Sequence, residues 1–174
     1  MTAAYEELIH LLNEREIGYS TSDDQAIRTD LRGEIAVYRI VARVEVEAEL
    51  FQVFGYSPVR IPQGCAPAIA EAIIRANYGL RIGKFELDLD DGELRFHVAQ
   101  ILVYESVGEE VIDRMIGTAI NMLDMYLPAF LSVIYANELP LDAIRRVEAV
   151  YRQPSETETN LMDQDEDPEL ELDD

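Results

Sequence analysis

The sequence contains little of the chemistry on which most enzymes and metal sites depend. Its 174 residues include one cysteine, two histidines and one lysine. A single cysteine forms no disulfide within the chain, which fits a reducing compartment. Because no Cys/His cluster at metal-binding spacing is present, we expect no metal and no cofactor. The glycine-rich signatures GxGxxG and GxxxxGK(S/T) are missing too, which removes the usual support for nucleotide binding.

Long apolar runs and a cationic leader are also missing. The longest nearly apolar stretch, 125–136, has 12 residues and contains Pro128 and Ser132. A membrane-spanning helix needs about 20 apolar residues. The opening MTAAYEELIHLL carries Glu6 and Glu7 and has no lysine or arginine, unlike a secretory signal peptide. We therefore expect a cytoplasmic protein with no membrane as a partner.

Positive charge is scarce throughout the chain. There are 35 acidic and 14 basic residues, which give a net charge of −21. A surface this negative repels the phosphates of nucleic acids and the headgroups of anionic lipids. We therefore expect no nucleic acid as a partner.

The acidic residues are concentrated at the C-terminus. Residues 153–174 contain ten of them and no basic residue. This segment has too few apolar side chains to offset the entropy of ordering, which predicts a disordered acidic tail. An alternative is that it folds onto a cationic partner or onto basic residues of the same chain. Residues 1–152 carry a net charge of −11, and they are enough for a single domain with one core.

Hydrophobic periodicity divides this domain into helices and strands. We expect helices over 3–17, 67–78, 109–136 and 140–151, and strands over 26–31, 35–46, 49–56 and on both sides of 91–92. Thr2 is expected to cap the first helix, Gly18 to end it, and 20–24 to form a loop. The order α-β-β-β-α-β-β-α-α has no strand–helix alternation. It therefore predicts an α+β fold, a twisted antiparallel sheet with helices packed on it.

A β-hairpin is indicated where Asp91 and Gly92 separate two alternating runs. If these two residues form the turn, counting outwards fixes the pairing of the strands. The expected pairs are Leu89 with Leu94, Leu87 with Phe96, Phe85 with Val98, Asp88 with Arg95, and Glu86 with His97. One face of this hairpin is then apolar, and the other carries charge pairs.

Two surfaces are candidates for partner binding, and the first is a sheet face. Arg39 and Arg43 lie in phase on one strand, and Arg95 lies in phase with Ile101 and Val103 on another. Such a face is part cationic and part apolar. Either the arginine stems cover apolar surface while their heads meet nearby acids, or the face recognises a partner segment.

The second candidate surface is on the long helix expected over 109–136. Beyond one apolar stripe, Met115, Met122 and Tyr126 widen its apolar arc past a single face. A helix that is apolar nearly all round is buried on more than one side. Either a second chain covers it, which predicts a homodimer or a partner groove, or the first and last helices do.

Three further residues are of types that take part in catalysis. Cys65 lies just before the helix that begins near Pro67, where a helix N-terminus lowers a thiol pKa, but the chain has no resolving cysteine. His10 is expected to pair with Glu6 and Glu14 at helical spacing, and His97 with an acid of the hairpin. Neither histidine suggests a catalytic site.

The order of elements and one segment resemble the YbjN family. The segment is Asn77 and Tyr78, followed by GKFELDLDDGELRF at 83–96, with Gly83, Lys84, Phe85, Asp88, Gly92 and Arg95 as its most specific residues. The resemblance covers about residues 3–136. It implies a fold like that of type III secretion chaperones, frequent dimerisation and no catalytic residues. It also implies a role in sensory-transduction regulation or in chaperone-like binding of protein segments.

These observations favour a non-catalytic, homodimeric protein-interaction module that binds a protein segment or a regulatory partner. The candidate partner-binding residues are Arg39, Arg43, Arg95, Ile101, Val103, Met115, Met122 and Tyr126. One alternative is a thiol-dependent enzyme or redox sensor that uses Cys65. Another is a small-ligand sensor with a pocket between the sheet and the long helix.

Overall fold

The computed structural model describes residues 2–22 and 25–152. Within them the elements are α1 (Ala3–Glu14), β1 (Ser20–Ser22), β2 (Ala26–Arg32), β3 (Val37–Glu45), β4 (Leu50–Tyr56), η1 (Gln63–Cys65), α2 (Ala66–Gly79), β5 (Lys84–Leu87), β6 (Leu94–Ile101), α3 (Glu109–Tyr135) and α4 (Pro140–Arg152). The predicted α+β fold and element order are confirmed, with β1 as an additional strand. The expected tail, 153–174, lies outside the described residues.

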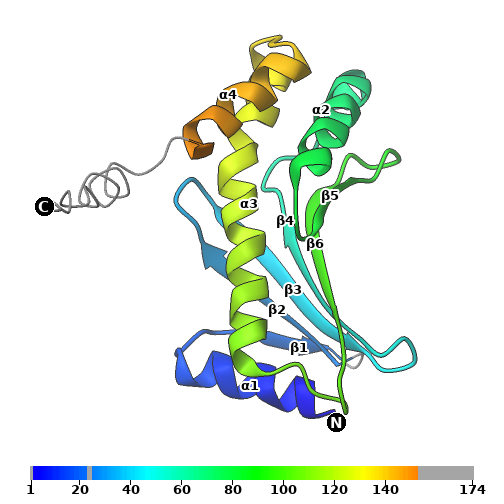
Figure 1. The fold of residues 1–174 in the computed structure, drawn as a ribbon, viewed down its shortest axis with the longest axis vertical. Helices are drawn as coiled ribbons and strands as arrows, with labels where there is room; N and C mark the ends of the chain where they lie inside the picture. The colour runs from blue at the N-terminus through cyan, green and yellow to red at the C-terminus, as the bar shows by residue number, and fades with distance from the viewer. Residues whose placement is uncertain (1, 23–24, 153–174) are drawn as a thin grey trace, which may run out of the picture.

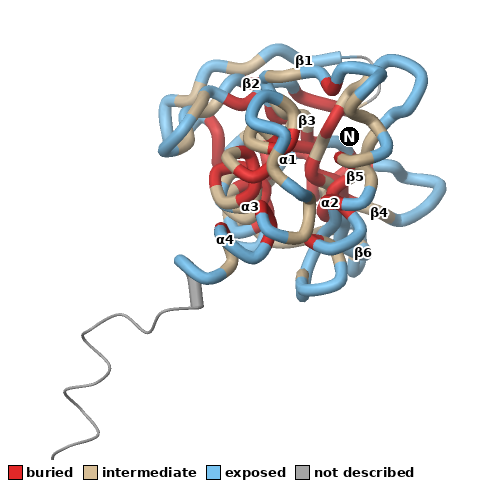
Figure 2. The backbone as a smooth tube through the Cα atoms, turned by 90° about the horizontal axis from the view of Figure 1, so that it is seen from above, coloured by how far each residue is buried: buried red, intermediate tan, exposed pale blue. Residues whose placement is uncertain are grey.

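The strands form one sheet in the order β1-β2-β3-β4-β6-β5, in which every neighbouring pair is antiparallel. Side chains alternate strictly along β3, where Tyr38, Ile40, Ala42 and Val44 are buried and their neighbours point the other way. The long α3 crosses the inner face, with α1 at one end of the sheet and α2 and α4 at the other (Figure 1). Figure 2 shows the buried residues gathered where α3 meets the strands.

Close packing joins α3 to the strands. A Cβ on Gly55 of β4 would lie 2.8 Å from Leu123 Cδ1, so glycine here lets the helix approach the sheet backbone. Phe85 of β5 makes edge contacts with Phe96, Tyr126 and Phe130, with ring centroids 5.0–5.3 Å apart. The space between the sheet and α3 is therefore filled by core side chains at these points, which gives no support to a ligand pocket there.

A buried carboxylate ties α3 to the turn between β2 and β3. Asp124, only 6% exposed, accepts hydrogen bonds from the backbone N–H groups of Glu34 (2.7 Å) and Ile35 (3.0 Å) and from the Tyr38 hydroxyl (2.6 Å). Burial, together with this acidic neighbour, raises the pKa of Tyr38 well above its usual range. A Cβ on Gly33 would lie 2.4 Å from Asp124 Oδ2, so the turn needs glycine for the carboxylate to approach.

Three local expectations need correction. Helix α1 ends at Glu14, and Glu16, with φ of 55°, takes the left-handed position expected of Gly18. Thr2 precedes α1 but makes no capping hydrogen bond; its hydroxyl lies 3.1 Å from Gln25 Oε1 instead. Within the loop expected at 20–24, Ser20–Ser22 form the edge strand β1, whose side chains are all exposed and give no hydrophobic pattern.

The hairpin forms, but its register differs by two residues from the expected one. Leu87 pairs with Leu94, Phe85 with Phe96, Glu86 with Arg95 and Lys84 with His97. A six-residue loop, 88–93, replaces the two-residue turn. The Asp88 and Asp91 carboxylates each accept the N–H two residues ahead (both 2.9 Å), so local side-chain bonds favour the longer loop. Because the shift is even, the side chains within β5 and β6 stay on their predicted faces, whereas Leu89, expected on the apolar face, lies in the loop and is 65% exposed.

We predict that Asp124→Ala will lower the free energy of unfolding by about 2 kcal/mol or more, because it leaves the buried Tyr38 hydroxyl and two part-buried backbone N–H groups without their acceptor. Denaturant unfolding measures this. The control is Asp113→Ala on the same helix, whose exposed ion pair with Arg15 is worth at most about 1 kcal/mol. Equal effects of the two substitutions would show that Asp124 has no special structural role.

Candidate interaction face

No helix of the described residues covers the other face of the sheet, which we call the outer sheet face. Its side chains lie in cross-strand rows fixed by the register. The central rows are Arg28, Val41, Phe54, His97 and Lys84; then Asp30, Arg39, Tyr56, Arg95 and Glu86. To one side lies the row Ala26, Arg43, Gln52 and Ala99, then Glu45, Leu50 and Ile101. Arg39, Arg43, Arg95 and Ile101 are thus brought to one face, as the strand phase indicated.

The outer sheet face carries a regular series of arginines along β2 and β3. Four successive rows contain Arg43, Arg28, Arg39 and Arg32, in that order. Arg43 and Arg39 belong to β3, and Arg28 and Arg32 belong to β2. We call these four residues the arginine ladder. All four are exposed, and successive rows on one face lie about 6.6 Å apart.

Aromatic rings lie beneath several of the guanidinium groups. Arg39 Cζ lies 4.3 Å from the centre of the Tyr56 ring, and Arg95 Cζ lies 4.7 Å from that of Phe54. The His97 ring stacks on the Phe54 ring, and the two ring centroids lie 4.4 Å apart. Phe54 is only 6% exposed although it belongs to the outer sheet face, because these side chains cover it.

The arginine heads meet acids but stay accessible. Arg39 lies 3.3 Å from Glu93, Arg43 lies 3.5 Å from Glu45, and their side chains are 53% and 45% exposed. Arg28 and Arg32 have no ion pair among the described residues. Exposed ion pairs contribute only about 0–1 kcal/mol, so an incoming carboxylate exchanges with them at little cost. The stems therefore cover aromatic rings and two of the heads meet acids, as the first interpretation holds; recognition of a partner segment stays a prediction.

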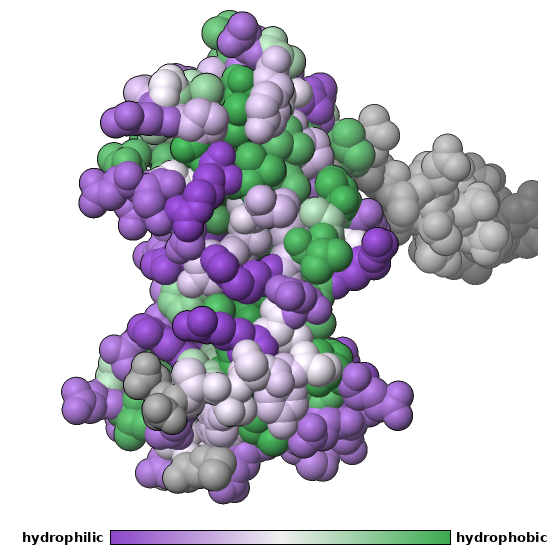
Figure 3. All heavy atoms as spheres, turned by 180° about the vertical axis from the view of Figure 1, so that it is seen from behind, coloured by the Kyte–Doolittle hydropathy of each residue, from purple (hydrophilic) through white to green (hydrophobic). Residues whose placement is uncertain are grey.

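The surface is hollowed at this position. A depression of about 410 Å³ opens above β2, β3, β4 and β6. It is lined by Ser22, Ala26, Arg28, Arg39, Val41, Arg43, Phe54, Tyr56, Glu93 and Arg95. Depressions of about 490 and 370 Å³ adjoin it and share Glu93 with it. Figure 3 shows this side of the molecule, with strongly hydrophilic side chains crossing hydrophobic surface at the narrow middle.

On the β5 side of the outer sheet face, three basic side chains surround the carboxylate of Glu86. Its carboxylate lies 2.8 Å from Lys84 Nζ, 2.7 Å from Arg95 Nε and 3.3 Å from His97 Nδ1. Burial raises its pKa, but the hydrogen bonds from these three side chains outweigh burial and lower the pKa to about 2. Burial also lowers the pKa of His97, whose Nε2 has no partner among the described residues.

The long-helix candidates lie elsewhere. Met115 and Tyr126 are buried in the core of this chain, at 6% and 2% exposed, so neither is available to a partner and we remove both from the candidate surface. Met122 is half-buried. Helices α1 and α4, the first and last, pack against α3 as the alternative expected, and α2, which the sequence did not point to, packs against it as well. Val103, 62% exposed, follows β6 beyond Ile101 in a bridge to Ser106.

Some residues of the outer sheet face escaped the sequence analysis. Arg28, Phe54 and Tyr56 occupy alternate positions of predicted strands, whereas Arg32 lies one residue beyond the strand expected over 26–31. Strand phase gives the face of each residue within its own strand, but it does not place the residue beside Arg39 and Arg43. The order and direction of the strands, which decide that β2 and β4 flank β3, had to be known first.

Cys65 is the remaining sequence candidate for chemistry. Cys65 ends η1, is partly buried against the core, and its sulfur makes no hydrogen bond among the described residues.

Helix α3 is the one described helix long and apolar enough to cross a membrane, yet half of its most apolar part is buried inside the fold, as expected of a core helix.

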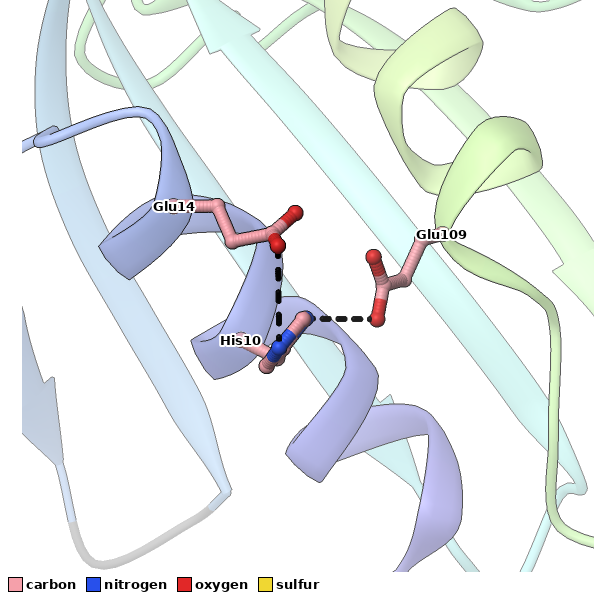
Figure 4. A group of neighbouring side chains, drawn as sticks. All are labelled: His10, Glu14 and Glu109. Atoms are coloured by element: carbon pink, nitrogen blue, oxygen red, sulfur yellow. Dashed lines mark ion pairs between the residues drawn. The ribbon is translucent and has the colours of Figure 1, made fainter.

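A group of His10, Glu14 and Glu109 has the composition of a metal site (Figure 4). His10 Nδ1 lies 2.9 Å from Glu109, whereas Nε2 faces Glu14 at 3.9 Å. One His10 nitrogen and one carboxylate oxygen from each acid lie within 4.8 Å of one another, but exposed acidic groups commonly gather in this way without an ion. The His10 and Glu14 side chains are also about 60% exposed. We interpret the group as an electrostatic contact between α1 and α3, in which Glu109 takes the place expected of Glu6.

The fold and the outer sheet face define a class of protein: a small α+β domain with helices on one side of an antiparallel sheet and a charged, aromatic surface on the other. The chain belongs to the YbjN family, whose model, described as "Putative bacterial sensory transduction regulator", matches residues 4–132. No curated protein matches the sequence.

A solved structure supports the same fold. It is described as "Crystal structure of YbjN, a putative transcription regulator from E. coli" and superimposes with a TM-score of 0.57. The match covers 80% of this chain and 96% of that chain, at 12% sequence identity. At this identity the likeness shows the fold. The relation to type III secretion chaperones stays a prediction.

We predict that Glu86→Gln will lower the free energy of unfolding by about 1–3 kcal/mol at pH 7. The pKa of about 2 in the folded protein lies below the ordinary value of 4.5. The stabilisation is therefore complete above about pH 5 and is lost as the pH falls towards 2. Urea unfolding across this range should show the two proteins converging at low pH. Glu71→Gln, which removes an exposed helical pair, is the control; a pH-independent difference for Glu86→Gln would contradict the assignment.

Proposed function

We propose that this protein is a non-catalytic regulatory protein whose outer sheet face binds an extended, acidic segment of a partner protein. The observation that supports this proposal is the arginine ladder, a regular series of exposed guanidinium groups on a chain with a net charge of −21. Arginine and aromatic side chains are enriched in protein interfaces, and guanidinium groups bind carboxylates well. The family description supports a regulatory role.

The spacing of the arginine ladder specifies the segment. In an extended chain, alternate side chains point to the same side and lie about 6.6 Å apart, the spacing of the ladder rows. A segment running along β3 therefore places carboxylates over Arg43, Arg28 and Arg39 when its acids occupy positions i, i+2 and i+4. Phe54 and Tyr56, beside these arginines, supply flat surface against which the segment packs.

We predict that Arg28→Gln, Arg39→Gln and Arg43→Gln together will weaken the binding of such a segment about tenfold or more. The probe is a fluorescein-labelled peptide in which glutamate alternates with threonine, and fluorescence anisotropy with the full chain measures its affinity.

The matched control replaces Arg81, Arg114 and Arg145 by glutamine, which removes the same charge away from the outer sheet face. A peptide with glutamine in place of glutamate controls for non-ionic binding. Equal losses in the two triple variants would show that the peptide senses only net charge, and would contradict a specific face.

We also propose that the protein acts as a homodimer in the cytoplasm. The family resemblance supports dimerisation. Helix α2 supports it too, because its side chains Ile74 and Tyr78, four residues apart on one side of the helix, are 70% and 96% exposed.

Light scattering should give about twice the chain mass of 19.7 kDa. Tyr78→Glu should give a monomer, whereas Tyr104→Glu, which changes an equally exposed tyrosine, should not. A wild-type monomer at micromolar concentration would contradict this proposal.

A further inference from the structure

The acidic C-terminal sequence has the two-residue period of the arginine ladder. Positions 163, 165, 167, 169, 171 and 173 are all aspartate or glutamate. In an extended conformation these six carboxylates would line one side of the segment, about 6.6 Å apart. Residues 163–173 lie outside the described part of the structure, so the correspondence is between their sequence and the described outer sheet face.

We propose that residues 163–173 bind the outer sheet face of the same chain and compete there with a partner's acidic segment. This inference rests on the proposed function, because both segments use the arginine ladder. The consequence is regulation, since the partner gains access only by displacing the chain's own C-terminal segment.

The connecting sequence is long enough for this contact. Ten residues separate Arg152, at the end of α4, from Asp163. Extended, they span about 33 Å. A helix layer and a sheet together are about 20 Å thick, so the chain can pass from the helical side around the sheet to its outer face.

The charges of the domain favour the arginine ladder over other surfaces. Residues 1–152 carry a net charge of −11, so most of their surface repels an acidic segment. Arg60, which borders the outer sheet face, pairs with Asp91 at 2.5 Å. Away from that face, Arg15, Arg75 and Arg146 each meet an acid of the domain at 2.6–2.8 Å. Arg81, Arg114 and Arg145 have no ion pair among the residues that the structure describes, which makes them the appropriate control.

A spin label on the C-terminal sequence tests the contact directly. In the full chain, Asn160→Cys carries the label and Cys65→Ser removes the native thiol. At about 0.01 M salt we expect strong broadening of the amide signals of β2 and β3. At about 1 M salt, where screening shortens from about 30 Å to about 3 Å, the broadening should disappear. Uniform or absent broadening at low salt would overturn the inference.

The arginine variants give this measurement its specificity. Arg28→Gln, Arg39→Gln and Arg43→Gln together should abolish the broadening of β2 and β3. The triple change at Arg81, Arg114 and Arg145 should leave it in place. If the second set abolishes it as well, the contact depends on net charge alone and the inference fails.

A competition measurement, in chains that keep Cys65, separates this inference from the proposed function. All ten acidic residues of 156–174 are replaced by their amides, and the affinity for the alternating glutamate peptide is measured again. We expect binding to tighten about threefold or more, because a tethered competitor acts at millimolar effective concentration. Peptide binding of unchanged affinity would refute the C-terminal contact and leave the proposed function standing. No peptide binding in either chain would refute both.

Discussion

The position of α3 across the sheet depends on the buried carboxylate of Asp124. It accepts hydrogen bonds from two backbone N–H groups of the β2–β3 turn and from the Tyr38 hydroxyl, and Gly33 leaves the space for its close approach. Because an unpaired buried carboxylate is costly, the helix and the turn are stable only together. This contact holds α3 on one side of β2 and β3, and the arginine ladder occupies the opposite side of the same two strands.

The two faces of the sheet therefore have different energetic roles. The inner face buries aliphatic and aromatic side chains against α3 and provides most of the stability. The outer sheet face combines guanidinium groups with rings that they cover, and its ion pairs are exposed and weak individually. A partner can exchange these contacts without disturbing the core. In the proposed function, a local cationic surface on a strongly acidic chain would also guide acidic segments to one place.

The family relation and the outer sheet face contribute different information. Membership in the YbjN family and the superposition on a solved YbjN structure establish the architecture, while 12% identity to that structure transfers no binding residues. The function argued for this chain comes from its own arginines, rings and acidic C-terminal sequence. The period of two that these share is a property of extended chains, and it accounts for both the proposed partner segment and the proposed competitor.

Periodicity alone determined the helices, most strands, the fold class and the side of the sheet on which Arg39, Arg43, Arg95 and Ile101 lie, because hydrophobic alternation is local. It did not reveal β1, whose exposed side chains carry no pattern. The hairpin register required the carboxylate hydrogen bonds of Asp88 and Asp91, which lengthen the loop. Only the tertiary structure buried Met115 and Tyr126 beneath neighbouring helices and aligned Arg28 and Arg32 with the arginines of β3. Strand order and helix packing bring together residues far apart in sequence, and no local pattern contains that information.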